Sequence, residues 1–292
     1  LHRSPGAFFE KEIHSNGTEL FSARVIPFRG SWMEFSTDIR DVLWAYVDRK
    51  KKVPVTTLLR ALGFSSDEEI IRMFGFADPV DVESEDEFEE HLGRELATSV
   101  TIDKTIEIVD EDTGEVVDEE KEREVLIPAE HELEEDDWEV LEEHGITRVY
   151  LVRDEEEIGD DELDKTTLVE TLKKDPTHTE EEALNHIYQK LRGSEAPDLD
   201  SAKQALDRLF FNEQRYDLGD VGRHRINERL DVDVDEDTHV LTKEDVVGIV
   251  RELIRLQNGM STADDIDHLS NRRVKSVGEQ LGSQFSLGLA RM

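Results

Sequence analysis

Acidic side chains are concentrated in less than a third of this chain, and this uneven distribution limits where a core can form. The segment from Asp81 to Lys165 holds 36 acidic and 7 basic residues, which accounts for −29 of the formal net charge of −37. The segments from Leu1 to Arg60 and from Ser261 to Met292 are nearly balanced, with 10 basic against 7 acidic residues and 4 against 4. Because the charge is confined, the rest of the 292 residues can build the core of one large domain or two modest ones.

The composition also excludes several classes of protein. There is no cysteine, which rules out a disulfide or zinc–thiolate scaffold and fits a reducing compartment. No apolar stretch approaches the roughly 18 residues of a membrane helix, and no basic-then-apolar start resembles a signal peptide. We therefore expect a cytoplasmic protein with no membrane partner. A start at Leu1 and a stop inside an apolar helical pattern suggest a piece of a longer or processed polypeptide. The pattern consists of Val274, Val277, Leu281, Phe285 and Leu289.

The acidic segment carries strand signals of its own. Thr105–Val109 and Glu115–Val117 flank the turn residues Asp112–Gly114, which predicts a β-hairpin, and Arg148–Val152 predicts another strand. We expect a folded, β-containing subdomain, with a disordered tail as the alternative. Its acidity is typical of a solvated surface, or of adaptation to a high-salt cytoplasm.

The N-terminal region alternates apolar and polar residues in the manner of strands. Three strands are predicted at Glu19–Ile26, Ser31–Phe35 and Val42–Val47. A helix is predicted from Pro54 to Leu62, and a second one from a capping box at Ser66 through Phe74.

Beyond the acidic segment the apolar spacing becomes helical. Helices are predicted behind Thr179–Glu182 and around Ala205–Phe210. Thr242 and Asp245 are expected to cap a strong helix that stops at Asn258–Gly259. The fold class predicted from these elements is α+β.

The sequence lacks the usual signatures of catalysis and metal binding. It contains no Walker loop, dinucleotide-binding glycine motif, nucleophile elbow or zinc-protease motif. Asp231–Asp235 begins like a calcium loop, but Glu236 and Thr242 stand where that loop needs glycine and glutamate. Acidic pairs such as Asp264–Asp265 arise by chance among 72 acidic residues. An independent hydrolase therefore has no supporting constellation.

The charge also bears on nucleic-acid binding. A strongly acidic chain is a poor free-standing binder, because phosphate contacts supply most of the nonspecific affinity. It can still hold a small pocket that reads bases while other parts of an assembly hold the phosphates. The two balanced ends are the segments suited to face a polyanion.

Four groups of short stretches, in order along the chain, resemble the β subunit of bacterial DNA-directed RNA polymerase. They are LHRSPG (Leu1–Gly6); ARVIPFRGSW (Ala23–Trp32) with DRKKK (Asp48–Lys52); LFF (Leu209–Phe211) with RYDL (Arg215–Leu218) and VGR (Val221–Arg223); and DDIDHL (Asp264–Leu269) with NRR (Asn271–Arg273) and SVGE (Ser276–Glu279).

This resemblance implies the lobe of the β subunit, in two segments at 1–77 and 162–292, with a lineage-specific acidic insertion at 78–161. In that family the lobe forms one wall of the DNA cleft. The resemblance also implies the other subunits (β′, α and ω), sigma factor, and promoter and downstream DNA as partners. The parent enzyme is a nucleotidyltransferase whose catalytic Mg²⁺ is held by another subunit. The fragment is therefore expected to hold no cofactor or metal and to be inactive alone, and the insertion's partner is unknown.

The same resemblance implies a pocket for non-template single-stranded DNA near the transcription start. Trp32 matches the residue on which an unstacked base lies, and Asp267 matches the carboxylate that recognises a flipped guanine. Arg3, Ile266 and Arg272 match other pocket residues. A carboxylate can accept two hydrogen bonds from guanine's Watson–Crick edge, an indole adds stacking, and arginines offset repulsion from phosphates.

Each matched residue also has a purely structural interpretation. Trp32 can be half-buried core, Asp267 can cap a helix beginning near Ser270, and Arg3 and Arg272 can be surface ion pairs. A second function class is a free-standing acidic interaction module or DNA mimic. A mimic is expected to display carboxylates around its binding face, whereas the matched residues avoid the acidic segment.

Three departures from the family pattern concern loops and one cation. Ser270 stands where the family has glycine, and Lys275 stands where it has arginine, which removes a planar fork. The Arg192–Pro197 segment lacks the family's proline-rich run, which is expected to reshape a loop.

Overall fold

The computed structural model describes residues 1–47, 51–109, 116–153 and 166–289, and the chain divides into two compact units. The first unit comprises Leu1–Ser65 and Leu163–Met292, and the second comprises Ser66–Glu162. Both units combine helices and strands, so the predicted α+β class is confirmed. The placement of a lineage-specific insertion at 78–161 stays a prediction.

The first unit is built on a five-stranded antiparallel sheet in chain order. Its strands are β2 (Gly6–Ile13), β3 (Glu19–Ile26), β4 (Met33–Thr37), β5 (Leu43–Val47) and β6 (Lys51–Pro54). Buried and half-buried residues alternate strictly along β4 and β5, so one face of these strands points into the core. Of the DRKKK stretch, residues 48–50 lie outside the described residues.

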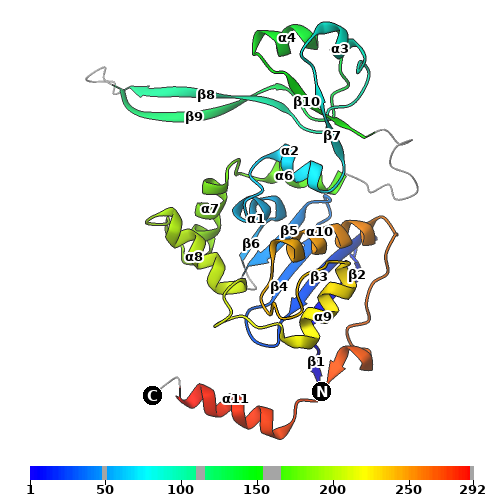
Figure 1. The fold of residues 1–292 in the computed structure, drawn as a ribbon, viewed down its shortest axis with the longest axis vertical. Helices are drawn as coiled ribbons and strands as arrows, with labels where there is room; N and C mark the ends of the chain where they lie inside the picture. Colours follow the sequence, from blue (N-terminus) through cyan, green and yellow to red (C-terminus); the bar gives the residue numbers. More distant parts are fainter. Residues whose placement is uncertain (48–50, 110–115, 154–165, 290–292) are drawn as a thin grey trace. The chain divides into compact units, whose positions relative to one another are not determined.

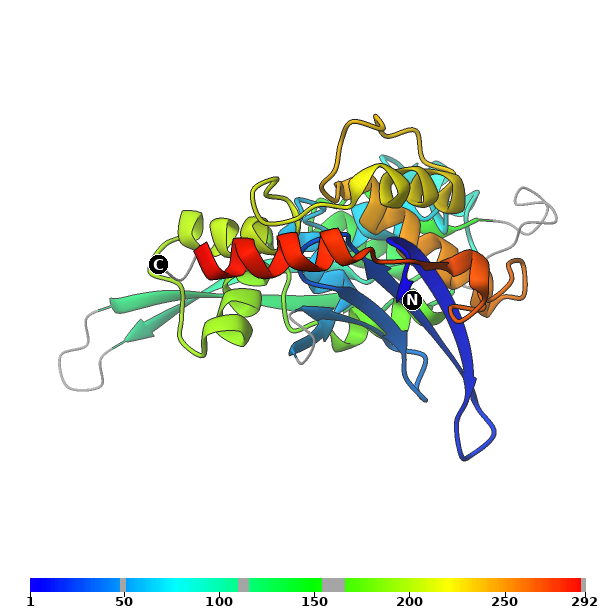
Figure 2. The same cartoon turned by 90° about the horizontal axis from the view of Figure 1, so that it is seen from below.

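Helices α9 (Gly219–Leu230) and α10 (Lys243–Gln257) pack against β2 and β3 and cover one face of the sheet (Figures 1 and 2). The predicted capping box is confirmed. The Thr242 hydroxyl accepts a hydrogen bond from the Asp245 N–H at 3.2 Å, and the Thr242 N–H donates to the Asp245 carboxylate at 2.7 Å. The apolar stripe of α10 faces the core, which joins the sheet to the helical layer.

Four further described helices of this unit lie before α9 in the chain. They are α1 (Val55–Ala61), α6 (Thr166–Lys174), α7 (Glu180–Arg192) and α8 (Leu199–Phe210). Helix α1 packs on α7 and α7 packs on α8, so the predicted helices after Pro54 and Thr179 are confirmed.

The N-terminal residues pair with a segment that precedes the last helix, in a short ribbon. Strand β1 (His2–Arg3) pairs antiparallel with β11 (Arg272–Arg273), which follows the 3₁₀ turn η2 (Leu269–Asn271) (Figure 1). Helix α11 (Val277–Leu289) comes next, as its sequence pattern predicts. The apolar side chains of that pattern are exposed.

The second unit contains the acidic segment. Its elements are α2 (Asp67–Met73), β7 (Ala77–Asp81), α3 (Glu85–Glu89), β8 (Val100–Val109), β9 (Val116–Ile127), α4 (Asp137–Glu143) and β10 (Arg148–Val152). Strand β8 pairs with β9, and β7 pairs with β10, so the predicted hairpin and the strand at Arg148–Val152 are confirmed. The predicted turn Asp112–Gly114 lies outside the described residues.

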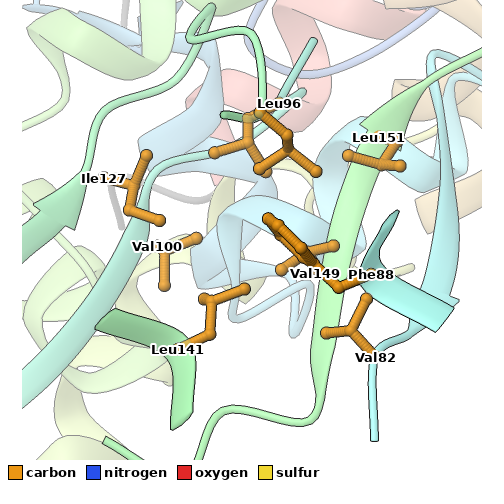
Figure 3. Close-up of a cluster of buried hydrophobic side chains, with 9 residues drawn as sticks. Val82, Phe88, Leu96, Val100, Ile127, Leu141, Val149 and Leu151 are labelled. Atoms are coloured by element: carbon orange, nitrogen blue, oxygen red, sulfur yellow. The ribbon is translucent and has the colours of Figure 1, made fainter. Parts of the chain in front are cut away.

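A small apolar core holds the second unit together (Figure 3). Its buried members are Val82, Phe88, Leu96, Val100, Ile127, Leu133, Leu141, Val149 and Leu151. The Trp138 ring lies against Phe88, with ring centroids 5.7 Å apart. The described part of the acidic segment is therefore a packed subdomain rather than a tail, with its carboxylates around an apolar centre.

Candidate nucleic-acid interface

Trp32 and Ile266 come from opposite ends of the chain and lie in one apolar cluster. Phe8 from β2 and Ile26 from the end of β3 complete it. Ile266 is buried, whereas Trp32, which immediately precedes β4, is half-buried against the other three side chains. Packing thus brings two of the five predicted pocket residues together.

The turn before Trp32 is fixed by a close backbone approach. The Arg29 N–H donates to the Asp217 carbonyl at 2.9 Å, and the Asp217 N–H donates back at 2.8 Å. Gly30 has φ +132°, and a Cβ on it would lie only 2.7 Å from the Tyr216 ring. Only glycine therefore allows this turn to place Trp32 beside the cluster.

The Arg24 side chain, from β3, lies over the Trp32 ring. Its guanidinium carbon is 6.0 Å from the ring centroid, within the range of a cation–π interaction. The same guanidinium forms ion pairs with Glu10 at 3.2 Å and Glu34 at 3.1 Å. The structural interpretation of Trp32 as half-buried core is therefore correct, and its partial exposure is compatible with a stacking role.

Asp267 is exposed at the centre of the loop between α10 and β11. Its backbone N–H donates to the Asp265 carboxylate at 3.0 Å. Its own carboxylate has no partner within the part of the chain that the structure describes. Its interpretation as a helix cap is wrong, because the His268 ring caps the η2 turn, accepting a hydrogen bond from the Ser270 N–H at 3.3 Å. The Asp267 carboxylate thus remains available to a ligand.

The acidic pair at the start of this loop has a structural role. The Asp264 N–H donates to the Phe9 carbonyl at 2.6 Å, and the Phe9 N–H donates to the Asp264 carboxylate at 2.8 Å. The Asp265 carbonyl accepts a hydrogen bond from the Asn271 side-chain amide at 2.7 Å. These bonds attach the loop to β2 and close it on itself.

Arg3 and Arg272 lie directly opposite each other in the β1–β11 ribbon. Neither forms an ion pair with any residue in the described ranges, so their interpretation as surface ion pairs is wrong for this structure. The Arg272 Nε is buried without a hydrogen-bond partner among the described residues. Two arginines at paired positions, without a counter-charge among the described residues, favour an external anion.

The structure adds arginines that sequence reasoning missed. Arg192, Arg208 and Arg215 line a cavity of about 200 Å³, together with Leu191, Ala205 and Leu209. None of the three arginines pairs with a carboxylate among the described residues. Arg225, on α9, donates to the Ser270 carbonyl at 2.6 Å. No local pattern identifies these positions, because α7, α8 and the loop that carries Arg215 come together only in the fold.

The described residues offer neither a metal site nor a membrane span. No group of three histidine, cysteine or acidic side chains in them is arranged to hold a metal ion, the Asp231–Asp235 segment included. None of their helices combines the length and apolar character needed to cross a bilayer.

Comparisons with known proteins agree with the resemblance in the motifs. The family model described as RNA polymerase Rpb2, domain 2, matches residues 3–135 and 152–275. Over all 292 residues the chain is 85% identical to the DNA-directed RNA polymerase subunit beta of Salinibacter ruber. It is 50% identical to that of Porphyromonas cangingivalis and 51% identical to that of Christiangramia forsetii. The chain spans 22–23% of the length of these curated relatives. It therefore belongs to the RNA polymerase Rpb2 domain 2 family, as the lobe part of a bacterial β subunit.

Proposed function

We propose that this lobe, within a transcribing RNA polymerase, walls the DNA cleft and binds non-template single-stranded promoter DNA near the start site. One observation carries the proposal. The Asp267 carboxylate, which has no partner among the described residues, follows directly after Ile266, which packs with Trp32. The same loop ends at Arg272, which pairs with Arg3 in the ribbon and likewise has no ion-pair partner in the described ranges. A carboxylate and a cation thus belong to one loop and its end, a second cation lies on the paired strand β1, and the aromatic ring lies immediately before β4.

The chemistry suits an unstacked guanine. Guanine presents two neighbouring N–H donors on its Watson–Crick edge, and the Asp267 carboxylate can accept both. A base lying on the Trp32 indole gains roughly 1–3 kcal/mol from stacking, whichever base it is. Trp32 therefore contributes affinity, and Asp267 contributes the preference for guanine.

The cations suit the phosphates of the same strand. Arg3 and Arg272 compensate the repulsion between Asp267 and the DNA backbone. Arg192, Arg208 and Arg215 offer a second group of phosphate contacts in the same unit. Arginines left without a carboxylate partner in a chain of net charge −37 favour an external polyanion over internal pairing.

The remaining subunits complete the enzyme in this proposal. The lobe would assemble with β′, α, ω and sigma factor in the cytoplasm, and the Mg²⁺ that supports nucleotidyl transfer would be held by another subunit. The lobe alone would have no polymerase activity. For the acidic unit we propose no partner.

The charge distribution favours this function over a DNA mimic. The five pocket residues belong to the first unit, whereas the densely acidic segment belongs to the second. A mimic would be expected to combine its carboxylates with its binding face.

Site-specific crosslinking tests the proposal. A reconstituted polymerase carrying this segment is given a photoreactive base on the non-template strand just downstream of the start. We expect Trp32→Ala to reduce the crosslink for every base, and Asp267→Ala to remove only the preference for guanine. Asp233→Ala, at another exposed aspartate of the same unit, is the matched control. If Trp32→Ala and Asp267→Ala both behave like this control, the two residues are structural and the pocket assignment is wrong.

A further inference from the structure

Between its two ends, over residues 265–270, the loop that carries Asp267 forms one hydrogen bond to another element among the described residues. Arg225 Nη2 donates to the Ser270 carbonyl at 2.6 Å, across 45 positions of sequence. The other hydrogen bonds of residues 265–270 found in the described structure stay within residues 265–271. The bonds of Asp264 and Asn271 to the N-terminal strands hold only the two ends of the loop.

The position of the Arg225 side chain is itself fixed by the core of the first unit. Its stem passes against Gly6 of β2, where a Cβ would lie 3.3 Å from the Arg225 Cβ and 3.5 Å from its Cδ. Gly6 has φ +144°, which L side chains rarely adopt, so this close approach is specific to glycine. Helix α9 and strand β2 together determine where the guanidinium lies.

The hydrogen bond formed by this guanidinium is of a strong type. A charged donor makes a bond about twice as strong as a neutral one. The other terminal nitrogen, Nη1, is buried without a partner among the described residues, so no competing acceptor there draws the group away from the Ser270 carbonyl. Arg225 therefore links α9 to the turn that follows Asp267, through a hydrogen bond that is exposed to solvent.

We propose that Arg225 is a positioning residue for guanine recognition, acting through Asp267. The inference rests on the proposed function. The side chain of Ile266 anchors the loop on one side of Asp267, and Arg225 holds it on the other. Two parallel hydrogen bonds to a base edge require the carboxylate plane to be held in a narrow range of orientations. Without Arg225, the two ends of the loop stay attached but the orientation of the Asp267 carboxylate is no longer restrained. The preference for guanine over other bases should therefore fall, while stacking on Trp32 persists.

Two substitutions separate the hydrogen bond from the packing. Arg225→Met keeps a long stem against Gly6 and removes the donor, whereas Arg225→Lys keeps a charged donor. Arg40→Met, at an exposed arginine of the same unit, is the control. Each variant is tested in the full reconstituted polymerase. The measurement is the crosslinking yield with guanine divided by that with adenine, each placed on the non-template strand just downstream of the start. Total crosslinking and the melting temperature are recorded alongside.

We expect Arg225→Met to lower the guanine-to-adenine ratio about tenfold with total crosslinking retained. Arg225→Lys should restore most of the ratio, and Arg40→Met should leave it unchanged. The inference is overturned if Arg225→Met leaves the ratio intact while Asp267→Ala abolishes it. It is also overturned if Arg225→Met lowers the crosslinks to both bases in proportion, as a general folding defect would. If Asp267→Ala itself leaves the ratio intact, the proposed function fails and the inference fails with it.

Discussion

Arg223 of α9 and Asp245 of α10 form a bidentate ion pair in which both side chains are completely buried. Arg223 Nη1 lies 2.7 Å from Asp245 Oδ1, and Nη2 lies 2.9 Å from Oδ2. The Arg223 Nε also donates to the Thr238 carbonyl at 2.7 Å, and the Asp245 carboxylate takes part in the capping box of α10. This pair therefore joins the two helices that cover the sheet beneath the candidate site.

Arg223→Met is expected to destabilise the chain by about 3–5 kcal/mol, because the Asp245 carboxylate is left buried without its cation. Denaturant unfolding measures the change. The double variant Arg223→Met/Asp245→Asn keeps a capping side chain and removes the orphaned charge, so it should recover a large part of the loss. A double variant as unstable as the single one would contradict this explanation.

Gly30→Ala is expected to destabilise the first unit by about 1–3 kcal/mol, because the new Cβ meets the buried Tyr216 ring at 2.7 Å. Gly17→Ala is the matched control, since Gly17 also has positive φ, at +91°, but has open space around its Cβ position. Thermal or denaturant unfolding gives the difference between the two. If the two variants lose the same stability, backbone strain rather than the contact with Tyr216 causes the destabilisation. Gly30→Ala should also weaken Trp32-dependent crosslinking.

Acidification is expected to release the start of α11 from β11. Hydrogen bonds from Arg273, at 2.7 and 3.1 Å, lower the pKa of Glu279 below the ordinary glutamate value. A lowered carboxyl pKa stabilises the fold above the unfolded-state value, and that contribution is lost as the pH falls through the folded-state value. NMR titration of the Glu279 carboxyl carbon, in the folded and in the urea-unfolded chain, measures the pKa in each of the two states. The same titration midpoint in the two states would show that the contact between Arg273 and Glu279 does not stabilise the fold. Glu279→Gln should remove the pH dependence of this contact.

Added salt is expected to raise the melting temperature between low and molar KCl, because the net charge of −37 repels itself and salt screens that repulsion. Glu142→Gln/Glu143→Gln should raise the melting temperature at low salt and reduce the salt response. These two exposed carboxylates lie at the C-terminal end of α4, where negative charge opposes the helix dipole. A melting temperature that does not change with salt would count against charge repulsion as the main cause of instability at low salt.

Replacing Arg192, Arg208 and Arg215 by glutamine is expected to weaken single-strand binding by the reconstituted polymerase equally for all sequences. Each lost phosphate contact should reduce the slope of log affinity against log salt by about 0.7 for a single strand. Salt titrations of binding measure that slope, and the guanine preference serves as an internal control because it depends on Asp267. An unchanged slope would exclude these arginines from the DNA path.

Local chemistry was sufficient to predict many of the elements. The spans of β3 and β10 agree with the predicted strands, the starts of α2 and α10 follow the predicted caps at Ser66 and Thr242, and α7 begins at the predicted start behind Thr179. Caps and alternation depend on residues only a few positions apart, so a single sequence contains the information. Strand β2 and helix α9 are examples of elements that carried no such signal. Strand β2 begins with four consecutive buried residues instead of alternating, and α9 buries Gly222 and Arg223 beside Ile226 and Leu230, which weakens the apolar pattern.

The pocket residues came from the resemblance in the motifs, and their arrangement came from the fold. The sequence by itself determined the residue types, the concentration of charge in one segment and the ends of many helices. Tertiary structure alone decided that Trp32 packs with Ile266, that Arg3 faces Arg272, and that Arg225 holds the Ser270 carbonyl. These contacts join distant parts of the chain. Their geometry depends on how the sheet and its covering helices pack, which no local propensity encodes.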